Sequence, residues 1–285
     1  MKLEVIVHLG VHKTATTYIQ SSLLRNKKHL EDNRIAYIPL RDMRSGITSS
    51  ITEESVYASE IRNFLFTKID IEKYDRIIIS DENIIGGTND IFSQSNLYPR
   101  GHKNVEKIKE VFKDCNLKFL LAIRNYSDFY PSMYCEFLRH HEKFITFRHY
   151  ISTFNYLKYS WPYLIESIVR PTKEHPISIM QLEQLSEVED KLFQYFTGSS
   201  EVFISPAPKK DSRKSYKAKT VQMMDVLNKE LDGKYLIKFI NAIDKVNLKQ
   251  GQVKKFSPWN SSELSFFQEK YEQDLAYLRK QFDFI

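Results

Sequence analysis

The feature that most constrains the fold is the stretch from Val7 to Thr17, which reads VHLGVHKTATT. A β-branched run over residues 3–7 leads into it and is typical of a buried strand. An apolar pattern of helical period begins at Tyr18, directly after it. The sequence therefore predicts a tight turn that joins a strand to the N-terminus of a helix.

A turn of this kind is predicted to bind an anion. The first N–H groups of a helix have no partner within the helix, and the helix dipole places partial positive charge at the same end. Lys13 adds a full charge, while Thr14, Thr16 and Thr17 add short hydroxyl donors. Together these groups indicate a cradle for a phosphate or a sulfate.

The turn differs from a Walker A loop, which has glycine directly before its lysine. Here His12 precedes Lys13, and Gly10 stands at the third position before that lysine. The turn resembles instead the loop that binds the 5′-phosphosulfate in sulfotransferases using 3′-phosphoadenosine-5′-phosphosulfate (PAPS). Bacterial and glycan-directed members read H-K-T-G-T-T where this chain reads H-K-T-A-T-T. The residues that the resemblance assigns to donor binding are His12, Lys13, Thr14, Ala15, Thr16 and Thr17.

Ala15 is the departure from this family pattern. Glycine tolerates positive φ, which alanine resists. The substitution therefore matters if the turn requires a left-handed residue at this position.

A second feature follows another apolar run, residues 118–123, which is predicted to be a buried strand ending at Arg124. Ser132 lies eight residues beyond that arginine. The resemblance implies that these two residues bind the 3′-phosphate of the nucleotide, since a guanidinium forks onto phosphate oxygens and a hydroxyl completes the site. The family often has proline two residues after the arginine, where this chain has Tyr126. The alternative is a surface arginine at a strand end.

The third feature is a run of three isoleucines that ends in Ser80, Asp81 and Glu82. In open α/β sheets, ligands bind outside the carboxyl ends of the strands, so Glu82 is expected in the same crevice as Lys13 and Arg124. Glycan sulfotransferases end a similar strand in S-x-E, and the resemblance implies that Glu82 is the catalytic base. Three alternatives stay open: Asp81 as the base, the acidic pair as a Walker B motif, and a carboxylate that caps the next helix or pairs with a basic neighbour.

The resemblance also implies a mechanism in which positioning and charge stabilisation dominate, as they do in phosphoryl transfer. Lys13 stabilises the charge that develops on the leaving phosphate, and Glu82 accepts the proton of the acceptor hydroxyl. Arg124 and Ser132 hold the 3′-phosphate. PAPS is the expected donor and the 3′,5′-bisphosphate PAP the product, with no metal.

Length and composition predict one large α/β domain, with two domains as the alternative. The resemblance implies one sulfotransferase domain over residues 1–285, with a three-layer, P-loop-type α/β fold whose central, mainly parallel sheet is flanked by helices. A hydrophobic fraction of 42% excludes a disordered chain. The net charge of +6 suits a polyanionic nucleotide without requiring nucleic acid. The two cysteines have no CxxC spacing and are expected to be free thiols.

No targeting segment or membrane-spanning run is visible, so a bacterial, cytoplasmic enzyme is expected.

Residues 209–219 hold six basic residues and one acidic residue. Related enzymes carry a basic loop there that closes over the nucleotide, which makes Arg213 and Lys214 candidate contacts; a solvated charge run is the alternative. Residues 41–52, rich in Ser, Thr, Arg and Gly, are predicted to form a loop at the acceptor mouth.

The predicted function is transfer of a sulfuryl group from PAPS to a hydroxyl of a carbohydrate acceptor, a preference that comes from the family and from no identified substrate contact. Two other classes stay open. One is a P-loop kinase or nucleotide hydrolase that uses Asp81 and Glu82 as a Walker B pair. The other is a catalytically silent nucleotide-binding protein.

Overall fold

The computed structural model describes residues 2–93, 96–140, 144–169, 175–208, 215–228, 231, 233–249 and 254–285. The chain divides into two compact units. The first comprises Met1–Arg124, Tyr159–Ser212 and Asp274–Ile285, and the second comprises Asn125–Lys158 and Arg213–Gln273. A single sulfotransferase domain over residues 1–285 stays a prediction.

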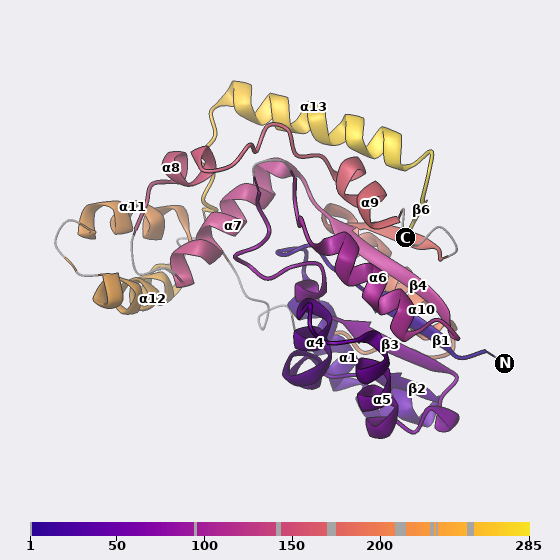
Figure 1. Ribbon diagram of the computed structural model, residues 1–285. Helices are drawn as coiled ribbons and strands as arrows, with labels where there is room; N and C mark the ends of the chain where they lie inside the picture. Colours follow the sequence, from indigo (N-terminus) through magenta and orange to yellow (C-terminus); the bar gives the residue numbers. More distant parts are fainter. Residues whose placement is uncertain are drawn as a thin grey trace. The chain divides into compact units, whose positions relative to one another are not determined.

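The first unit is built on a six-stranded sheet in the order β2-β3-β1-β4-β5-β6, and every neighbouring pair of strands is parallel (Figure 1). The strands are β1 Glu4–His8, β2 Ile35–Tyr37, β3 Arg76–Ser80, β4 Asn116–Ile123, β5 Ile177–Gln181 and β6 Asp283–Phe284. In the centre of the sheet, Val7 of β1 is in register with Ile79 of β3 and Phe119 of β4. Central parallel strands are covered on both faces, which explains their continuous apolar runs.

Helices cover both faces of this sheet. On one face, Ile6 of β1 and Leu120 of β4 belong to a core cluster with apolar residues of α1 (Thr16–Arg25), α2 (Lys27–Asp32) and α10 (Leu185–Thr197). In Figure 1, α6 (Gly101–Val111) and α9 (Trp161–Val169) lie on the opposite side of the sheet, with α5 (Ala58–Lys68) packed against α6. The predicted three-layer α/β fold is confirmed.

Residues 41–52 do not form the loop that their composition predicted. They are helical throughout, as the end of α3 (Leu40–Asp42), a π-helical turn η1 (Met43–Ile47) and α4 (Thr48–Thr52). Met43, Ile47 and Ile51 are all buried and recur every fourth residue, which is the spacing of one helix face. The surrounding polar residues concealed this pattern, so the prediction was wrong.

The described part of the first unit also contains three short 3₁₀ turns: η2 Ile71–Lys73, η3 Glu82–Ile84 and η5 Leu182–Gln184. Both cysteines of the chain are buried and free, as expected; Cys115 follows α6.

Among the helices that the structure describes, none has the length and apolar character needed to cross a bilayer.

The second unit is helical. It contains α7 (Tyr126–His140), α8 (Phe147–Ser152), α11 (Ala218–Leu227), α12 (Gly233–Lys249) and most of α13 (Ser261–Leu278), within which the division between the units falls. Aromatic side chains fill its core: the ring of Trp259 lies 4.7 Å from that of Phe267 and 4.9 Å from that of Phe147, centroid to centroid. The buried aromatic residues of this unit thus serve packing.

The start of α13 at Ser261 is stabilised by a local capping arrangement. Asn260 Oδ1 accepts the backbone N–H of Glu263 at 2.9 Å, and the Glu263 carboxylate accepts the backbone N–H of Asn260 at 2.8 Å. This reciprocal capping box satisfies two N–H groups that the helix leaves free.

Candidate functional site

The topology of the sheet indicates where a ligand can bind. From β1 the chain passes to β2 and β3 on one side, and from β4 it passes to β5 and β6 on the other. Crevices at such a reversal lie outside the carboxyl ends of the strands. Here these ends lead to the loop after His8, to Asp81 after β3 and to Arg124 after β4. All of these groups belong to the first unit.

The loop between β1 and α1 contains three residues in the left-handed region. Gly10 has φ +53°, Lys13 has φ +66° and Ala15 has φ +64°. A Cβ at Gly10 would lie 2.6 Å from Cγ2 of Thr16, so this position requires glycine for space as well as for conformation. The loop is therefore a sequence of tight turns, as predicted.

Ala15 occupies the position where the resembling family has glycine. The turn does require a left-handed residue at this position. It is the residue preceding α1 and adopts φ +64° and ψ +20°. A left-handed L-residue costs about 1–2 kcal/mol. Its methyl group packs against the core cluster under α1, which recovers up to about 0.8 kcal/mol. Alanine therefore lowers the stability of the loop, but the loop keeps its left-handed conformation at this position.

The N-terminus of α1 retains its capacity to bind an anion. Among the described residues, no side chain caps this helix start. Thr17 is exposed and Thr16 is buried. The Thr14 hydroxyl donates to the carbonyl of Val11 at 2.5 Å, so it stabilises the loop. Among the three predicted hydroxyl donors, Thr14 already donates its hydroxyl hydrogen to a backbone carbonyl of the described protein.

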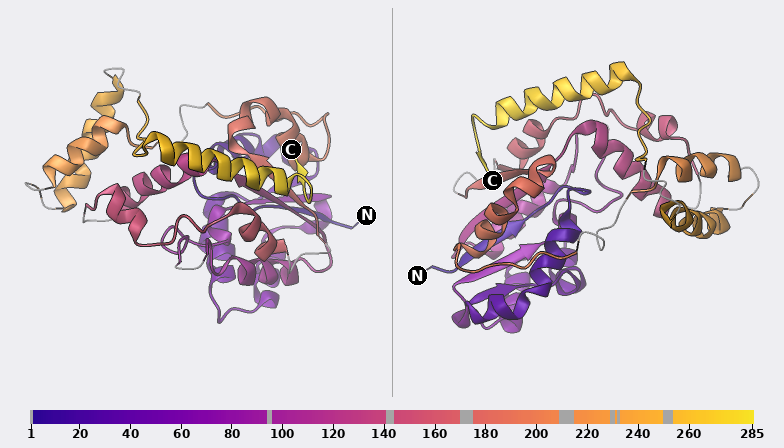
Figure 2. Two further views of the ribbon diagram at one scale, coloured as in Figure 1. Left: turned by 90° about the horizontal axis from the view of Figure 1, so that it is seen from above. Right: turned by 180° about the vertical axis from the view of Figure 1, so that it is seen from behind.

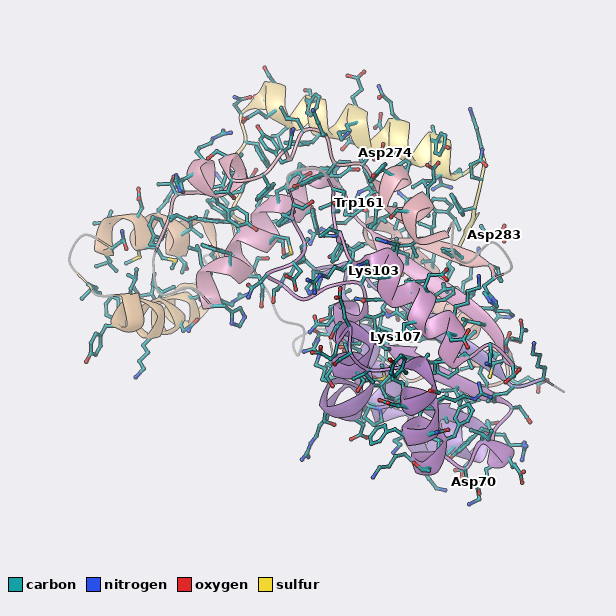
Figure 3. The ribbon with its side chains drawn as sticks, viewed as in Figure 1. Asp70, Lys103, Lys107, Trp161, Asp274 and Asp283 are labelled. Carbon is teal, nitrogen blue, oxygen red and sulfur yellow. The ribbon has the colours of Figure 1, made fainter. Side chains whose placement is uncertain are left out.

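Arg124 is tied to this loop. Its Nη1 donates to the carbonyl of Lys13 at 2.6 Å. The indole N–H of Trp161 donates to the carbonyl of Arg124 at 2.9 Å, and the backbone N–H of Trp161 donates to the carboxylate of Asp274 at 3.1 Å. Figure 3 labels Trp161 and Asp274, which come from α9 and α13. Trp161 is fully buried, so it holds the arginine backbone from within the core of the first unit.

Ser132, the predicted partner of Arg124, belongs to the second unit. It lies in α7, is nearly fully buried, and shares a hydrogen bond of 2.8 Å with the hydroxyl of Ser215. Its action together with Arg124 stays a prediction. Arg213 and Lys214, the predicted contacts of the basic loop, lie outside the described residues.

The two acidic residues after β3 have different surroundings. Asp81 is fully buried, and its carboxylate accepts from Nη2 of Arg44 at 3.1 Å, from Oγ1 of Thr48 at 2.7 Å and from the backbone N–H of Asn83 at 3.1 Å. The last of these bonds caps η3. Asp81 therefore fits the alternative of a carboxylate that caps the next helix and pairs with a basic neighbour, which is Arg44.

Glu82 is more accessible, with 15% of its side chain exposed. Its carboxylate accepts from Nη2 of Arg44 and from Nε2 of Gln20, both at 3.1 Å. Burial raises its pKa, but the His12 ring in its protonated form, the backbone N–H of Glu82, Arg44 and Gln20 together outweigh burial and hold the pKa below the usual range. Glu82 is therefore ionised at neutral pH.

Arg44 bears on whether the acidic pair could hold a metal. A Walker B pair binds Mg²⁺ through its carboxylates, yet a single nitrogen of Arg44 lies 3.1 Å from an oxygen of both Asp81 and Glu82. In the part of the chain that the structure describes, no group of three or more His, Cys, Asp and Glu residues is placed to hold a metal ion. A divalent cation at this pair would compete directly with the guanidinium.

His12 fastens the loop to the segment that follows β3. The Tyr98 hydroxyl lies 3.0 Å from both the backbone nitrogen and Nδ1 of His12, and Nε2 lies 3.1 Å from Oδ1 of Asn83. A neutral ring satisfies all three contacts, with the hydroxyl donating to Nδ1 and Nε2–H donating to Asn83. Burial lowers the pKa of His12, which favours this neutral form. The side chain that was predicted to contact the donor thus supports the loop.

His8 is likewise a packing residue. Its Nδ1 lies 2.8 Å from the Ser80 hydroxyl, and its ring meets that of Phe196 edge-on. Burial lowers its pKa to about 4, although the charge of Glu82 acts in the opposite direction. His8 is therefore neutral at physiological pH and has a structural role.

Sequence reasoning missed three residues at this site. Arg44 was hidden in the segment predicted to be a loop, and the spacing of the buried residues at 43, 47 and 51 was the signal that could have placed it on a helix. Gln20 follows Thr16 by one turn of α1, which puts both on the same helix face. Tyr98, at φ +49°, lies in irregular chain with no local pattern that identifies it.

No family model matches the chain, and no curated protein matches it. Among solved structures, it is similar to a sulfotransferase from Alicyclobacillus acidocaldarius. The two share 14% identical residues, and the match covers 89% of this chain and 97% of that one with a TM-score of 0.45. A similarity of this size does not establish a function for this chain, so the proposed function is based on the residues of the site.

Proposed function

We propose that this chain is a sulfotransferase that transfers a sulfuryl group from PAPS to a hydroxyl of a carbohydrate acceptor. The observation that carries the proposal is the meeting of a basic, left-handed loop with an arginine: Nη1 of Arg124 donates to the carbonyl of Lys13 at 2.6 Å. The ionised carboxylate of Glu82 stands after the adjacent strand β3, at the same edge of the sheet. Transfer of an anionic group from a nucleotide to a hydroxyl needs these three elements.

The loop suits the anionic end of such a donor. Left-handed residues at Lys13 and Ala15 turn the backbone in the manner of anion-binding nests, and the N-terminus of α1 adds its dipole. Arg124 provides the planar fork that matches a phosphate. Bound PAPS would supply a sulfuryl group on a phosphate leaving group. In this proposal Lys13, Thr16 and Thr17 contact the phosphosulfate.

Glu82 is the proposed base, and its surroundings favour it over Asp81. The oxygens of Asp81 accept from Arg44, Thr48 and the Asn83 backbone, and its side chain is fully buried. Glu82 is ionised and partly exposed, so it can accept a proton from an acceptor hydroxyl. The lowered pKa keeps the base ready at neutral pH while reducing its proton affinity.

The kinase or nucleotide hydrolase alternative is less well supported. It requires Asp81 and Glu82 to hold Mg²⁺, and Arg44 pairs with both carboxylates. The catalytically silent alternative shares the nucleotide site and differs only in turnover, so a transfer assay with labelled PAPS and polysaccharide acceptors separates it from an enzyme.

Calorimetric titration with adenosine 3′,5′-bisphosphate tests the donor site, with AMP and Mg²⁺-ATP as comparators. We expect about micromolar binding of the bisphosphate without metal, much weaker binding of AMP, and loss of this preference in Arg124→Ala. Arg34→Ala is the matched control, because Arg34 forms an exposed pair with Asp75 and has no proposed role. Tight Mg²⁺-ATP binding with no preference for a 3′-phosphate would overturn the proposal in favour of a kinase.

A further inference from the structure

Positive charge is concentrated in one part of the chain. Residues 209–255 contain 13 Lys and Arg against five Asp and Glu, a net charge of +8, whereas the whole chain carries +6. The remainder is therefore slightly acidic, at −2. Charge asymmetry of this kind indicates a polyanionic partner or an anionic membrane.

This basic segment contains α11 and α12, which pack side by side in the second unit (Figures 1 and 2). An isolated antiparallel bridge between Lys217 and Lys255 brings together the chain entering and the chain leaving the pair. Asp244 of α12 accepts from the backbone N–H of Lys217 at 3.2 Å and from the Thr220 hydroxyl at 2.8 Å. These contacts hold the α11–α12 pair together where the chain enters and leaves it.

The α11–α12 pair has apolar side chains on two sides. Those that pack inward are Val221, Met224, Leu236 and Ile240. Among the side chains of the pair that the structure describes, three large apolar ones are exposed: Val226 at 68%, Tyr235 at 66% and Phe239 at 49%. Because Tyr235 and Phe239 are four residues apart, they lie on one face of α12.

Exposed lysines share these outer faces. Lys238 lies three residues from Tyr235 on α12, and Lys219 lies seven residues from Val226 on α11, so each lysine follows the same helix face as an exposed apolar residue. Aromatic and aliphatic groups flanked by lysine are the features of helices that lie in a membrane interface, where apolar groups enter the headgroup boundary and lysines meet anionic lipid.

We propose that the α11–α12 pair docks on an anionic lipid surface. The exposed apolar residues favour a bilayer over a soluble polyanion, because a sulfated or phosphorylated chain would leave Val226 and Phe239 in water. The proposal is independent of the sulfotransferase function, since none of the five exposed residues that carry it (Lys219, Val226, Tyr235, Lys238 and Phe239) is a candidate donor contact.

Co-sedimentation of the full chain with lipid vesicles tests this surface. We expect binding to vesicles of phosphatidylcholine with phosphatidylglycerol, weak binding to phosphatidylcholine alone, and loss of binding as salt is raised. Neutralising Lys219 and Lys238 with glutamine should weaken binding about fivefold for each lysine. The double variant Tyr235→Ser, Phe239→Ser should weaken it about tenfold or more.

Tyr163→Ser with Phe266→Ser is the matched control, because these aromatic residues are also exposed on helices but lie outside the basic segment. Circular dichroism and titration with adenosine 3′,5′-bisphosphate should be unchanged in every variant, so that a failure of the donor site shows in the titration alone. Equal binding to neutral and anionic vesicles would overturn the proposal. So would dextran sulfate binding that is as tight as vesicle binding and insensitive to the aromatic variant, because the surface would then recognise soluble polyanions.

Discussion

Replacing Arg44 with methionine isolates the charge interaction that holds the acidic pair. Nη2 of Arg44 lies 3.1 Å from an oxygen of Asp81 and of Glu82, and Nε lies 3.3 Å from Asp81. Methionine retains most of the aliphatic stem and removes every donor. The variant therefore leaves a fully buried Asp81 carboxylate without its cation.

The expected loss of stability is about 2 kcal/mol. Hydrogen bonds to charged groups contribute about 1.5–3 kcal/mol each, and breaking a buried ion pair costs about 3–5 kcal/mol. Arg44 is 42% exposed, so water can solvate part of the space it leaves, and Asp81 keeps its bonds to Thr48 and the Asn83 backbone. Both facts place the loss below the range for a fully buried pair.

The loss should depend on pH with a defined sign. Burial raises the pKa of Glu82, but His12, its own backbone N–H, Arg44 and Gln20 outweigh burial and lower it. A lowered folded-state pKa contributes stability that is complete above the unfolded value of about 4.3 and is lost as pH falls through the folded value. Without Arg44 the pKa of Glu82 rises, so the Glu82 part of the deficit is largest at neutral pH and shrinks in acid.

Urea denaturation followed by circular dichroism at neutral pH and below about pH 4 measures this difference. Arg34→Met is the control, because its pair with Asp75 is about half exposed on both sides, so water screens it and its loss should change stability little. The reasoning is refuted if Arg44→Met costs no more than Arg34→Met, or if its cost is the same at both pH values.

Substitutions at three further positions test the loop and the proposed base. Glu82→Gln should keep bisphosphate binding and lower transfer of labelled sulfate about hundredfold or more, whereas an unchanged rate would move the base role to Asp81. Lys13→Ala should lower turnover about 10²–10³-fold in the same assay, and a change confined to KM would argue against charge stabilisation during transfer. Ala15→Val should lower the free energy of unfolding by about 1–2 kcal/mol because a β-branched residue resists the left-handed region, while Ala15→Gly should stay within about 1 kcal/mol of the original chain. Equal stability of the valine and glycine variants in urea denaturation would contradict the left-handed assignment.

The amino-acid sequence by itself determined the α/β class and the edge of the sheet where the candidate site lies. Strands β1, β3 and β4 were predicted close to their observed bounds, because apolar runs of strand length with polar residues after them are local signals. The turn around Lys13 was equally readable, since glycine, lysine and threonines between a strand and a helix have few other uses. The two-residue strand β6 carries no such pattern and was not predicted.

Only the tertiary structure decided how the chemistry-bearing residues are divided between support and function. His12 was predicted to contact the donor, yet its ring is held by Tyr98, which lies 86 residues away in irregular chain. Asp81 and Glu82 are adjacent carboxylates, and no local pattern indicates that one is buried under Arg44 and Thr48 while the other stays accessible. These differences arise from contacts between distant segments, which composition and periodicity do not encode, so burial and pairing emerge only once the chain is folded.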